Sequence, residues 1–257
     1  LRLASVVQLG GVCARATPAE RASTRAATAR NFICAADTTA RTAHPRRPRH
    51  AVTPTESGKR VDASGIAIWL TRADGSGAPA PANARRRVRI VQRDKKFIPS
   101  TIVVQVGTAV DFPNDDPFFH NVFSYYDCIK FDLGLYESGA SRGVTFTRPG
   151  RCFVFCNIHP EMSAMIVVVD TPYSALSTLT GDVTIGNVPP GRYTASVWHE
   201  RFGLATPNEF PRDVIVSDEN RSLGTIRLID AGKALGAHTN KYGHEYVPPP
   251  PTSPTYR

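Results

Sequence analysis

The sequence has few cysteines and no long uninterrupted apolar run. Five Cys among 257 residues are too few to build a disulfide scaffold at this length. No stretch approaches the ~18 uncharged apolar residues that a membrane-spanning helix needs, so we predict no transmembrane segment. The chain is 41% apolar, which is enough for a real core in one or two domains.

Outside its first 50 residues, the chain also lacks an excess of charge of one sign. The net charge of +9 is concentrated in residues 1–50, which hold nine Arg against only Glu20 and Asp37. Residues 51–257 hold 22 basic and 20 acidic residues, so this part offers no basic face for a duplex. We expect no specific nucleic acid partner, although an Arg-rich arm binds polyanions without specificity.

Motifs of common catalytic sites are missing. The sequence has no Gly-rich phosphate loop, no haem-attachment motif and no Ser, His and Asp in hydrolase order. Asp111, Asp115 and Asp116 suggest paired carboxylates, but Asn-Asp-Asp-Pro at 114–117 is typical of a turn, and no nucleophile pattern surrounds it. We therefore predict that the protein is not an enzyme.

Soft and borderline metal ligands gather in one short stretch of the chain. Cys156, His159 and Met162 occur within seven residues, and His120 stands 36 residues before Cys156 in the aromatic segment 118–123. A thiolate, two imidazoles and a thioether are the ligands of a blue-copper electron-transfer centre, with Met weakly axial. A short loop after a strand can direct three of these donors at one atom, and another strand supplies His120. The sequence therefore predicts a site for one copper ion.

Two alternatives at this site stay open from the residues alone. Met165 competes with Met162 for the axial position, although a Met that starts an apolar strand is commonly a core residue. Zinc competes with copper because four donors would make a structural set: Cys152, Cys156, His159 and His120. In a regular strand Cys152 and Cys156 lie about 13 Å apart at ~3.3 Å per residue, which argues against a shared ion. Cys152 either forms a disulfide with Cys128, which an exported protein permits, or both remain separate buried thiols.

The copper motif and several further segments carry a family resemblance. His120-Asn121, followed by Cys156-x2-His159-x2-Met162, resembles the cupredoxins, and the short Cys-to-Met loop is similar to that of amicyanin. Six segments more closely resemble the bacterial plastocyanin-like proteins often labelled methylamine utilization proteins: 110–114, 120–124, 131–134, 156–162, 187–193 and 240–243. The resemblance covers about residues 65–246.

This resemblance implies a type 1 copper centre that carries single electrons between redox partners in the periplasm or otherwise outside the cytoplasm. His120, Cys156, His159 and Met162 are implied to bind the copper, and Asn121 to brace the two ligand-bearing segments near the Cys156 sulfur. We expect the outer edge of His159 to be exposed as the electron port. A redox partner protein would dock transiently on an apolar rim beside it, formed by Phe118, Phe119 and Pro160.

A second hypothesis is a non-redox envelope module that binds copper for sensing, delivery or stability, or binds protein or glycan. Residues 3–12, followed by Ala14-Arg15-Ala16, fit the end of a signal region and a misassigned or truncated start of the chain equally well. The extracytoplasmic location therefore rests on the resemblance. No oligomeric state is predicted.

Short segments rich in β-branched and aromatic residues follow one another at the spacing of an all-β sandwich. The resemblance implies a cupredoxin Greek-key β-sandwich, and we expect a second small β-sandwich beside it. Five regions are predicted: a disordered basic segment at 1–57, the first strand of the second sandwich at 60–84, the cupredoxin domain at 85–170, a carboxypeptidase-regulatory-like or transthyretin-like sandwich at 171–230, and a Pro-rich tail at 231–257.

The second sandwich is expected to be interrupted by the copper domain. Its C-terminal part offers four strands, the first two joined as a hairpin: 180–185, 193–198, 212–216 and 223–228. An opening strand is missing from this part, and residues 66–70 are the candidate. The hypothesis requires 66–70 to pair with a strand that follows Thr171.

Overall fold

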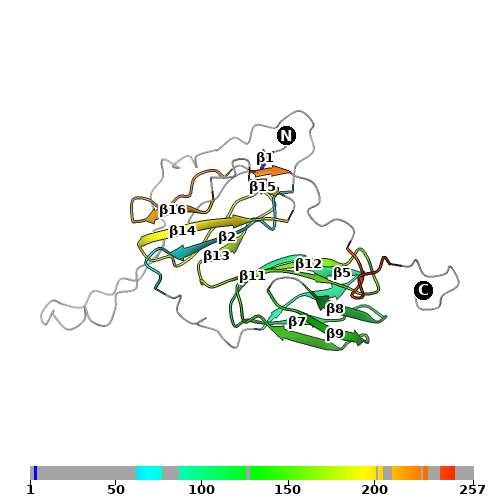
Figure 1. The fold of residues 1–257 in the computed structure, drawn as a ribbon. Coiled ribbons are helices and arrows are strands. Elements are labelled where there is room, and N and C mark those ends of the chain that lie inside the picture. The colour runs from blue at the N-terminus through cyan, green and yellow to red at the C-terminus, as the bar shows by residue number, and fades with distance from the viewer. Residues whose placement is uncertain are drawn as a thin grey trace, which may run out of the picture.

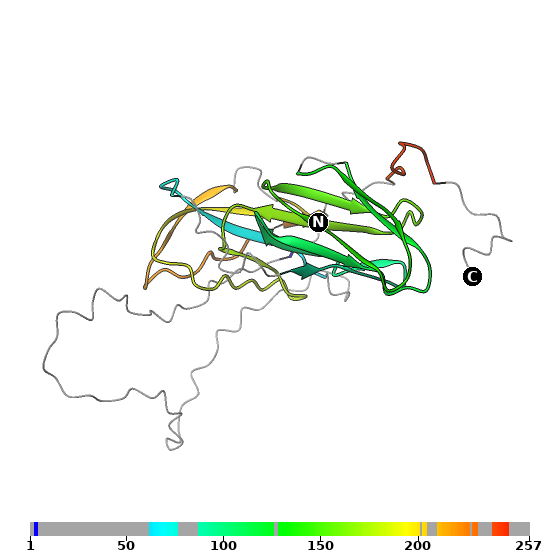
Figure 2. The ribbon, with the colours of Figure 1, turned by 90° about the horizontal axis from the view of Figure 1, so that it is seen from below.

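The computed structural model describes residues 3–4, 62–76, 87–125, 128–200, 202–204, 210–226, 228–230 and 238–246. Every regular element in these ranges is a β-strand, and they contain no helix of the length and apolarity needed to cross a membrane. Figures 1 and 2 show the strands gathered in two bodies that lie side by side. The all-β prediction is confirmed.

The larger body, which we call the first sandwich, consists of two sheets. Its five-stranded sheet runs in the order β6 (Thr101–Gln105), β12 (Ser163–Val169), β11 (Gly150–Phe155), β8 (His120–Ser124) and β9 (Phe131–Tyr136). The second sheet runs in the order β10 (Ser141–Thr145), β7 (Ala109–Pro113) and β3 (Val88–Arg89). A separate two-stranded hairpin is formed by β4 (Val91–Arg93) and β5 (Lys96–Ile98).

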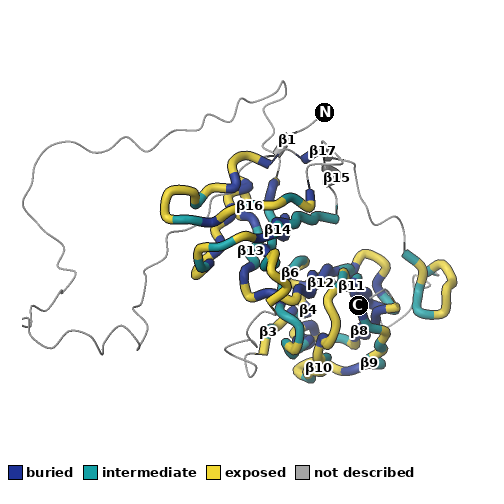
Figure 3. Tube along the Cα trace, turned by 60° about the vertical axis from the view of Figure 1, so that its left-hand side comes forward, coloured by how far each residue is buried: buried dark blue, intermediate teal, exposed yellow. Residues whose placement is uncertain are grey.

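Alternating apolar residues build the core of the first sandwich. Ile102 and Val104 of β6, and Val110 and Phe112 of β7, are buried in one cluster, because side chains two positions apart share one face of a strand. Each such side chain stabilises the fold by about 1.5–3 kcal/mol. Figure 3 shows buried stretches of chain, in dark blue, in both bodies.

The smaller body is built on a four-stranded antiparallel sheet in the order β13 (Ser174–Leu176), β2 (Ala67–Arg72), β14 (Gly191–Trp198) and β16 (Arg212–Val216). Trp69 of β2 is paired with Ser174 on one side and with Ser196 on the other. The strand predicted at 66–70 thus pairs with two strands that follow Thr171, as the insertion hypothesis requires. The insertion of residues 85–170 into a second domain remains our proposal.

The hairpin predicted from residues 180–185 and 193–198 is wrong. Both edges of β14 are occupied, by β2 and by β16, and residues 180–185 contain no strand. Val183 and Ile185 are nevertheless buried in the core of the smaller body. The alternation of apolar and polar residues there reflects packing onto one face of the sheet, not hydrogen bonding along its edge.

A small three-stranded sheet brings distant segments together. It contains β1 (Leu3–Ala4), β17 (Leu228–Asp230) and β15 (Phe202–Leu204), with β17 in the middle. The strand predicted at 223–228 therefore begins only at Leu228, and Leu3 and Ala4 are not disordered as predicted for 1–57. The rest of residues 1–57 and the Pro-rich residues 247–257 lie outside the described residues.

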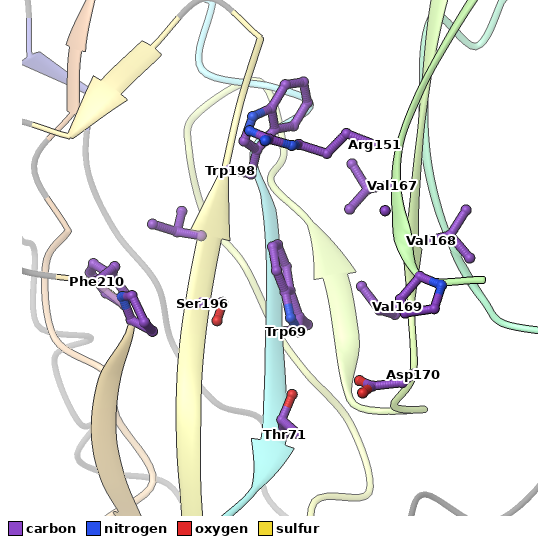
Figure 4. A pocket seen from close by; sticks show the side chains of 14 residues that line it. Trp69, Thr71, Arg151, Val167, Val168, Val169, Asp170, Ser196, Trp198 and Phe210 are labelled. Atoms are coloured by element: carbon purple, nitrogen blue, oxygen red, sulfur yellow. The ribbon is translucent and has the colours of Figure 1, made fainter. Parts of the chain in front are cut away.

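The two bodies share an apolar contact between β12 and β2. Met165, Val167 and Val169 of β12 cluster with Ala67 of β2. A cleft of about 450 Å³ borders this contact (Figure 4). Its lining combines aromatic, aliphatic and a few polar side chains and includes none of the predicted copper ligands; among its members are Trp69, Trp198, Arg151 and Asp170.

Candidate metal centre

The predicted ligands come from the ends of three strands of the first sandwich. His120 is the first residue of β8, Cys156 follows the last residue of β11, and Met162 precedes β12. The loop between β11 and β12 is closed by two backbone hydrogen bonds, from Cys156 N to Met162 O (3.2 Å) and from Met162 N to His159 O (3.1 Å). Three of the four predicted ligands therefore lie on one tight loop.

The Cys156 sulfur lies close to both imidazoles. Its Sγ is 3.8 Å from Nδ1 of His120 and 3.5 Å from Nδ1 of His159. The ligand atoms of these three buried residues lie within 4.8 Å of one another, and no other such group of His, Cys and acidic side chains occurs within the described ranges. Metal bonds of about 2.0–2.3 Å in a trigonal plane place neighbouring donors about 3.6 Å apart. The three atoms therefore fit one ion.

The two methionines lie in different parts of the core. Both are fully buried. Met162 belongs to the same buried cluster as Cys156, whereas Met165 belongs to the cluster between the two bodies. This arrangement favours Met162 over Met165 as the axial ligand, and we retain Met162 as a proposal.

Cys152 is unavailable to a metal because it is bonded to Cys128 in a disulfide, with 5.5 Å between the two Cα atoms. The question left open by the sequence is thus answered in favour of the disulfide. Cys156 is the one free cysteine among the described residues. The zinc set that included Cys152 loses its second thiolate, so that alternative is wrong.

Asp116 fixes the orientation of the His120 ring. His120 Nε2 lies 2.7 Å from Asp116 Oδ2, so an Nε2–H that donates to the carboxylate leaves the Nδ1 lone pair toward the sulfur. The carboxylate also accepts backbone N–H bonds from Asp94 (2.7 Å) and Lys95 (3.0 Å). Turn chemistry at 114–117 gives no sign of this role. The spacing of an acidic residue four positions before a ligand His would have suggested it.

Burial sets the protonation of the site. Burial, with a smaller contribution from neighbouring His120, lowers the pKa of His159 to about 4. Burial also lowers the pKa of His120, against the opposing effect of its carboxylate partner. Both imidazoles are therefore neutral at pH 7, which is the form that binds metals. Burial raises the pKa of the Cys156 thiol, and backbone N–H groups that include those of Asn121 and Ile158 oppose this rise.

The backbone N–H of Asn121 acts directly on the Cys156 sulfur, whereas its side chain reaches the ligand loop through two intermediates. Its Nδ2 donates to Asp132 Oδ1 on β9 (2.7 Å), and Asp132 Oδ2 accepts from Lys241 Nζ (2.7 Å). Lys241 N in turn donates to Asn157 Oδ1 (2.9 Å). The bracing role of Asn121 stays a proposal, supported by the direct backbone contact and by the side-chain route through Asp132 and Lys241.

His159 does not present an open edge to solvent. Only 4% of its surface is exposed, and the Phe118 ring packs against it with 5.7 Å between ring centroids. Phe118 itself is half-buried, whereas Phe119 and Pro160 are exposed. The prediction of an exposed His159 edge is therefore wrong, because its place beside Pro160 gives no sign that Phe118 folds over the ring.

Residues 238–246 lie against the ligand loop, in contrast to the Pro-rich tail predicted there. In Figure 1 they are the red segment beside the first sandwich. The Tyr246 hydroxyl donates to Cys156 O (2.6 Å), and the His238 ring centroid lies 4.1 Å from that of Phe155. Sequence patterns give no sign of these contacts, because they join residues more than 80 positions apart.

No family model and no curated protein matches the chain. Among solved structures, a purple cupredoxin from Nitrosopumilus maritimus aligns with 32% of this chain and 99% of its own, at 22% identity and a TM-score of 0.30. An amicyanin mutant in the Cu(I) form aligns with 40% of this chain and 98% of its own, at 20% identity and a TM-score of 0.31.

A Cu-containing nitrite reductase from Thermus scotoductus SA-01 matches at 27% identity, with a TM-score of 0.32 over 37% of this chain. The chain spans only 24% of the length of that reductase. All three alignments cover less than half of the present chain. The assignment of the metal centre therefore rests on the geometry of its own residues.

Proposed function

We propose that this protein binds one copper ion in a type 1 centre and is an electron carrier, not an enzyme, between redox partners outside the cytoplasm. The main support is the Cys156 sulfur close to the Nδ1 atoms of His120 and His159, with Met162 in the same buried cluster. A thiolate, two imidazoles and a weak thioether form the donor set of copper sites that transfer electrons. Bound copper would supply a one-electron couple between Cu(II) and Cu(I).

The residues of the chain hold these donors in one arrangement. The closed loop fixes Cys156 and His159, the Asp116 carboxylate fixes His120, and backbone N–H groups near the sulfur stabilise a thiolate. Groups that are already in place need little rearrangement when the charge of a site changes. A small rearrangement is what rapid electron transfer requires.

An exposed apolar rim beside the site is suited to a transient partner. Phe119 is 52% exposed, Pro160 is exposed and Phe118 is half-buried against His159. Weak redox encounters bury less than about 1,200 Å², which a rim of this kind can provide. We propose that electrons pass through the Phe118 side of this rim.

The test is the absorption and spin-resonance spectra of the full chain loaded with copper. We expect one copper per chain and an intense blue or green band that is bleached reversibly by a reductant. Cys156→Ser should abolish the band, because serine lacks the thiolate whose bond to Cu(II) produces it. Ser163→Ala, just beyond the loop, is the control and should keep the band. An unchanged spectrum in Cys156→Ser would refute the assignment.

A second candidate is a non-redox envelope module that binds copper for sensing, delivery or stability, or binds protein or glycan, and the cleft between the two bodies favours the binding of protein or glycan. Its volume of about 450 Å³ is typical of a small-ligand site. Figure 4 shows the indoles of Trp69 and Trp198, the only two Trp of the chain, on its wall. A colourless protein that binds only Cu(I) would favour delivery. A change in Trp fluorescence on adding oligosaccharides would favour glycan binding.

A further inference from the structure

A folded segment covers one side of the ligand loop. Residues 238–246, which we call the C-terminal clasp, form hydrogen bonds to Cys156, Asn157 and Asp132. The motif Asn240-Lys241-Tyr242-Gly243 within it is one of the six segments that carry the family resemblance. None of its residues is a proposed copper ligand or part of the apolar rim, so the proposed function assigns no role to this motif.

Asn240 folds the clasp into a tight turn. Backbone hydrogen bonds run from Asn240 N to His244 O (2.8 Å) and from Gly243 N to Asn240 O (2.9 Å). The Asn240 side-chain oxygen also accepts the N–H groups of Tyr242 (2.9 Å) and His244 (3.1 Å). The turn therefore has its own hydrogen bonds and presents Lys241 in a defined position.

Lys241 connects the neighbours of two proposed ligands. Its backbone N–H donates to Asn157, the residue after Cys156, and its ammonium binds Asp132. Asp132 in turn accepts a hydrogen bond from Asn121, the residue after His120. The Lys241 side chain is only 18% exposed, so water competes weakly for the ion pair.

Tyr246 acts on Cys156 itself. Its hydroxyl donates to the Cys156 carbonyl (2.6 Å), and His238 Nδ1 lies 3.2 Å from the same hydroxyl. Burial raises the pKa of Tyr246, so the hydroxyl keeps its proton. Cys156 N already donates to Met162 O, so the N–H and the carbonyl of Cys156 are both held.

We infer that the C-terminal clasp is a positioning element of the copper centre, in which Lys241 and Tyr246 hold the ligand loop in place relative to His120. The inference rests on the proposed function, because the loop carries three of the four proposed ligands. β11 and β8 are paired at a single position, Phe155↔Phe123. The clasp therefore adds hydrogen bonds between the ligand loop after β11 and the segment around His120, which strand pairing connects at only this one position.

The experiment compares Tyr246→Phe and Lys241→Met with two matched controls in the full chain. Tyr193→Phe removes a similar hydroxyl bond, to Pro189 O (2.9 Å) in the smaller body, and Lys130→Met changes an exposed lysine. Two rates are measured: amide hydrogen exchange of residues 156–162 in the metal-free chain, and copper loss to a chelator from the loaded chain. Both rates should rise about fivefold to tenfold in the clasp variants, the factor that one lost hydrogen bond produces, and stay unchanged in the controls.

The two proposals fail in different ways. If both clasp variants exchange and release copper at the control rates, the clasp is only a covering and the inference is wrong. If the wild-type chain takes up no copper, the proposed function is wrong. In that case the exchange rates of the metal-free chain still decide whether the clasp holds the loop.

Discussion

At the scale of single residues, Asp116 can be tested by a nearly isosteric change. Asp116→Asn retains a hydrogen-bonding group beside His120 but removes the charge. A unit charge at about 7 Å, with an effective dielectric constant of about 20, is worth roughly 2 kcal/mol. Its loss destabilises Cu(II) more than Cu(I) and should raise the reduction potential by on the order of 100 mV. A redox titration of the copper-loaded chain measures this shift.

Asp115→Asn is the matched control for this prediction. Asp115 is the next residue, more exposed than Asp116, and paired with Arg93 at 2.6 Å. Water and Arg93 screen its charge, so its removal should change the potential far less. Equal shifts in the two variants would show a general effect of net charge and contradict the specific role of Asp116.

The donors of the site can be predicted from the sequence, but their surroundings cannot. Cys156 and His159 stand three positions apart on one tight loop, so their proximity follows from local geometry. Phe118 instead makes a contact that depends on how separate segments fold together, because its ring packs against His159 on another loop. No local pattern encodes such a contact, which is why the prediction of an exposed His159 edge is wrong.

At the scale of elements, β12 and the loop before it separate the two methionines. Met162 lies in the cluster of Cys156, and Met165 lies where β12 contacts the smaller body. Met162→Leu should alter the copper spectra and raise the reduction potential, because leucine has no donor atom. Met165→Leu conserves volume, so it should lower the free energy of unfolding by less than about 1.5 kcal/mol and leave the spectra unchanged. A spectrum altered only in Met165→Leu would reassign the axial ligand.

The presence of strands is easier to predict than their pairing. Residues 66–70 are rich in β-branched and aromatic side chains, and the lack of an opening strand in the C-terminal part indicated where they pair. Residues 180–185 show similar alternation and bury Val183 and Ile185. They cannot form the predicted hairpin with β14, because β2 and β16 already occupy both of its edges. The alternation of apolar and polar residues indicates which face of a segment is buried. Whether the segment pairs with a given strand also depends on whether an edge of that strand is free.

At the scale of the whole molecule, β12 contributes to the core of the first sandwich and to the apolar cluster between the two bodies. One face of the strand fills the first sandwich with Ala164, Ile166 and Val168. The other face contacts the smaller body through Met165, Val167 and Val169. The ligand loop leads directly into this strand, so the smaller body supports one end of the loop. The clasp, which follows the smaller body in sequence, holds the loop near its other end.

The buried imidazoles make the stability of the whole metal-free chain depend on pH. Burial lowers the pKa of His120, and it lowers that of His159 to about 4, whereas a histidine in the unfolded chain is protonated near about 6.5. As pH falls, the unfolded state binds protons first. Stability that is fully present above pH 6.5 is therefore lost toward pH 4, by about 3 kcal/mol for His159. Urea unfolding across this window should show the loss, and His159→Gln should reduce it. His244→Gln, at an exposed position, should not, and a profile equally steep without the His159 imidazole would contradict the assignment.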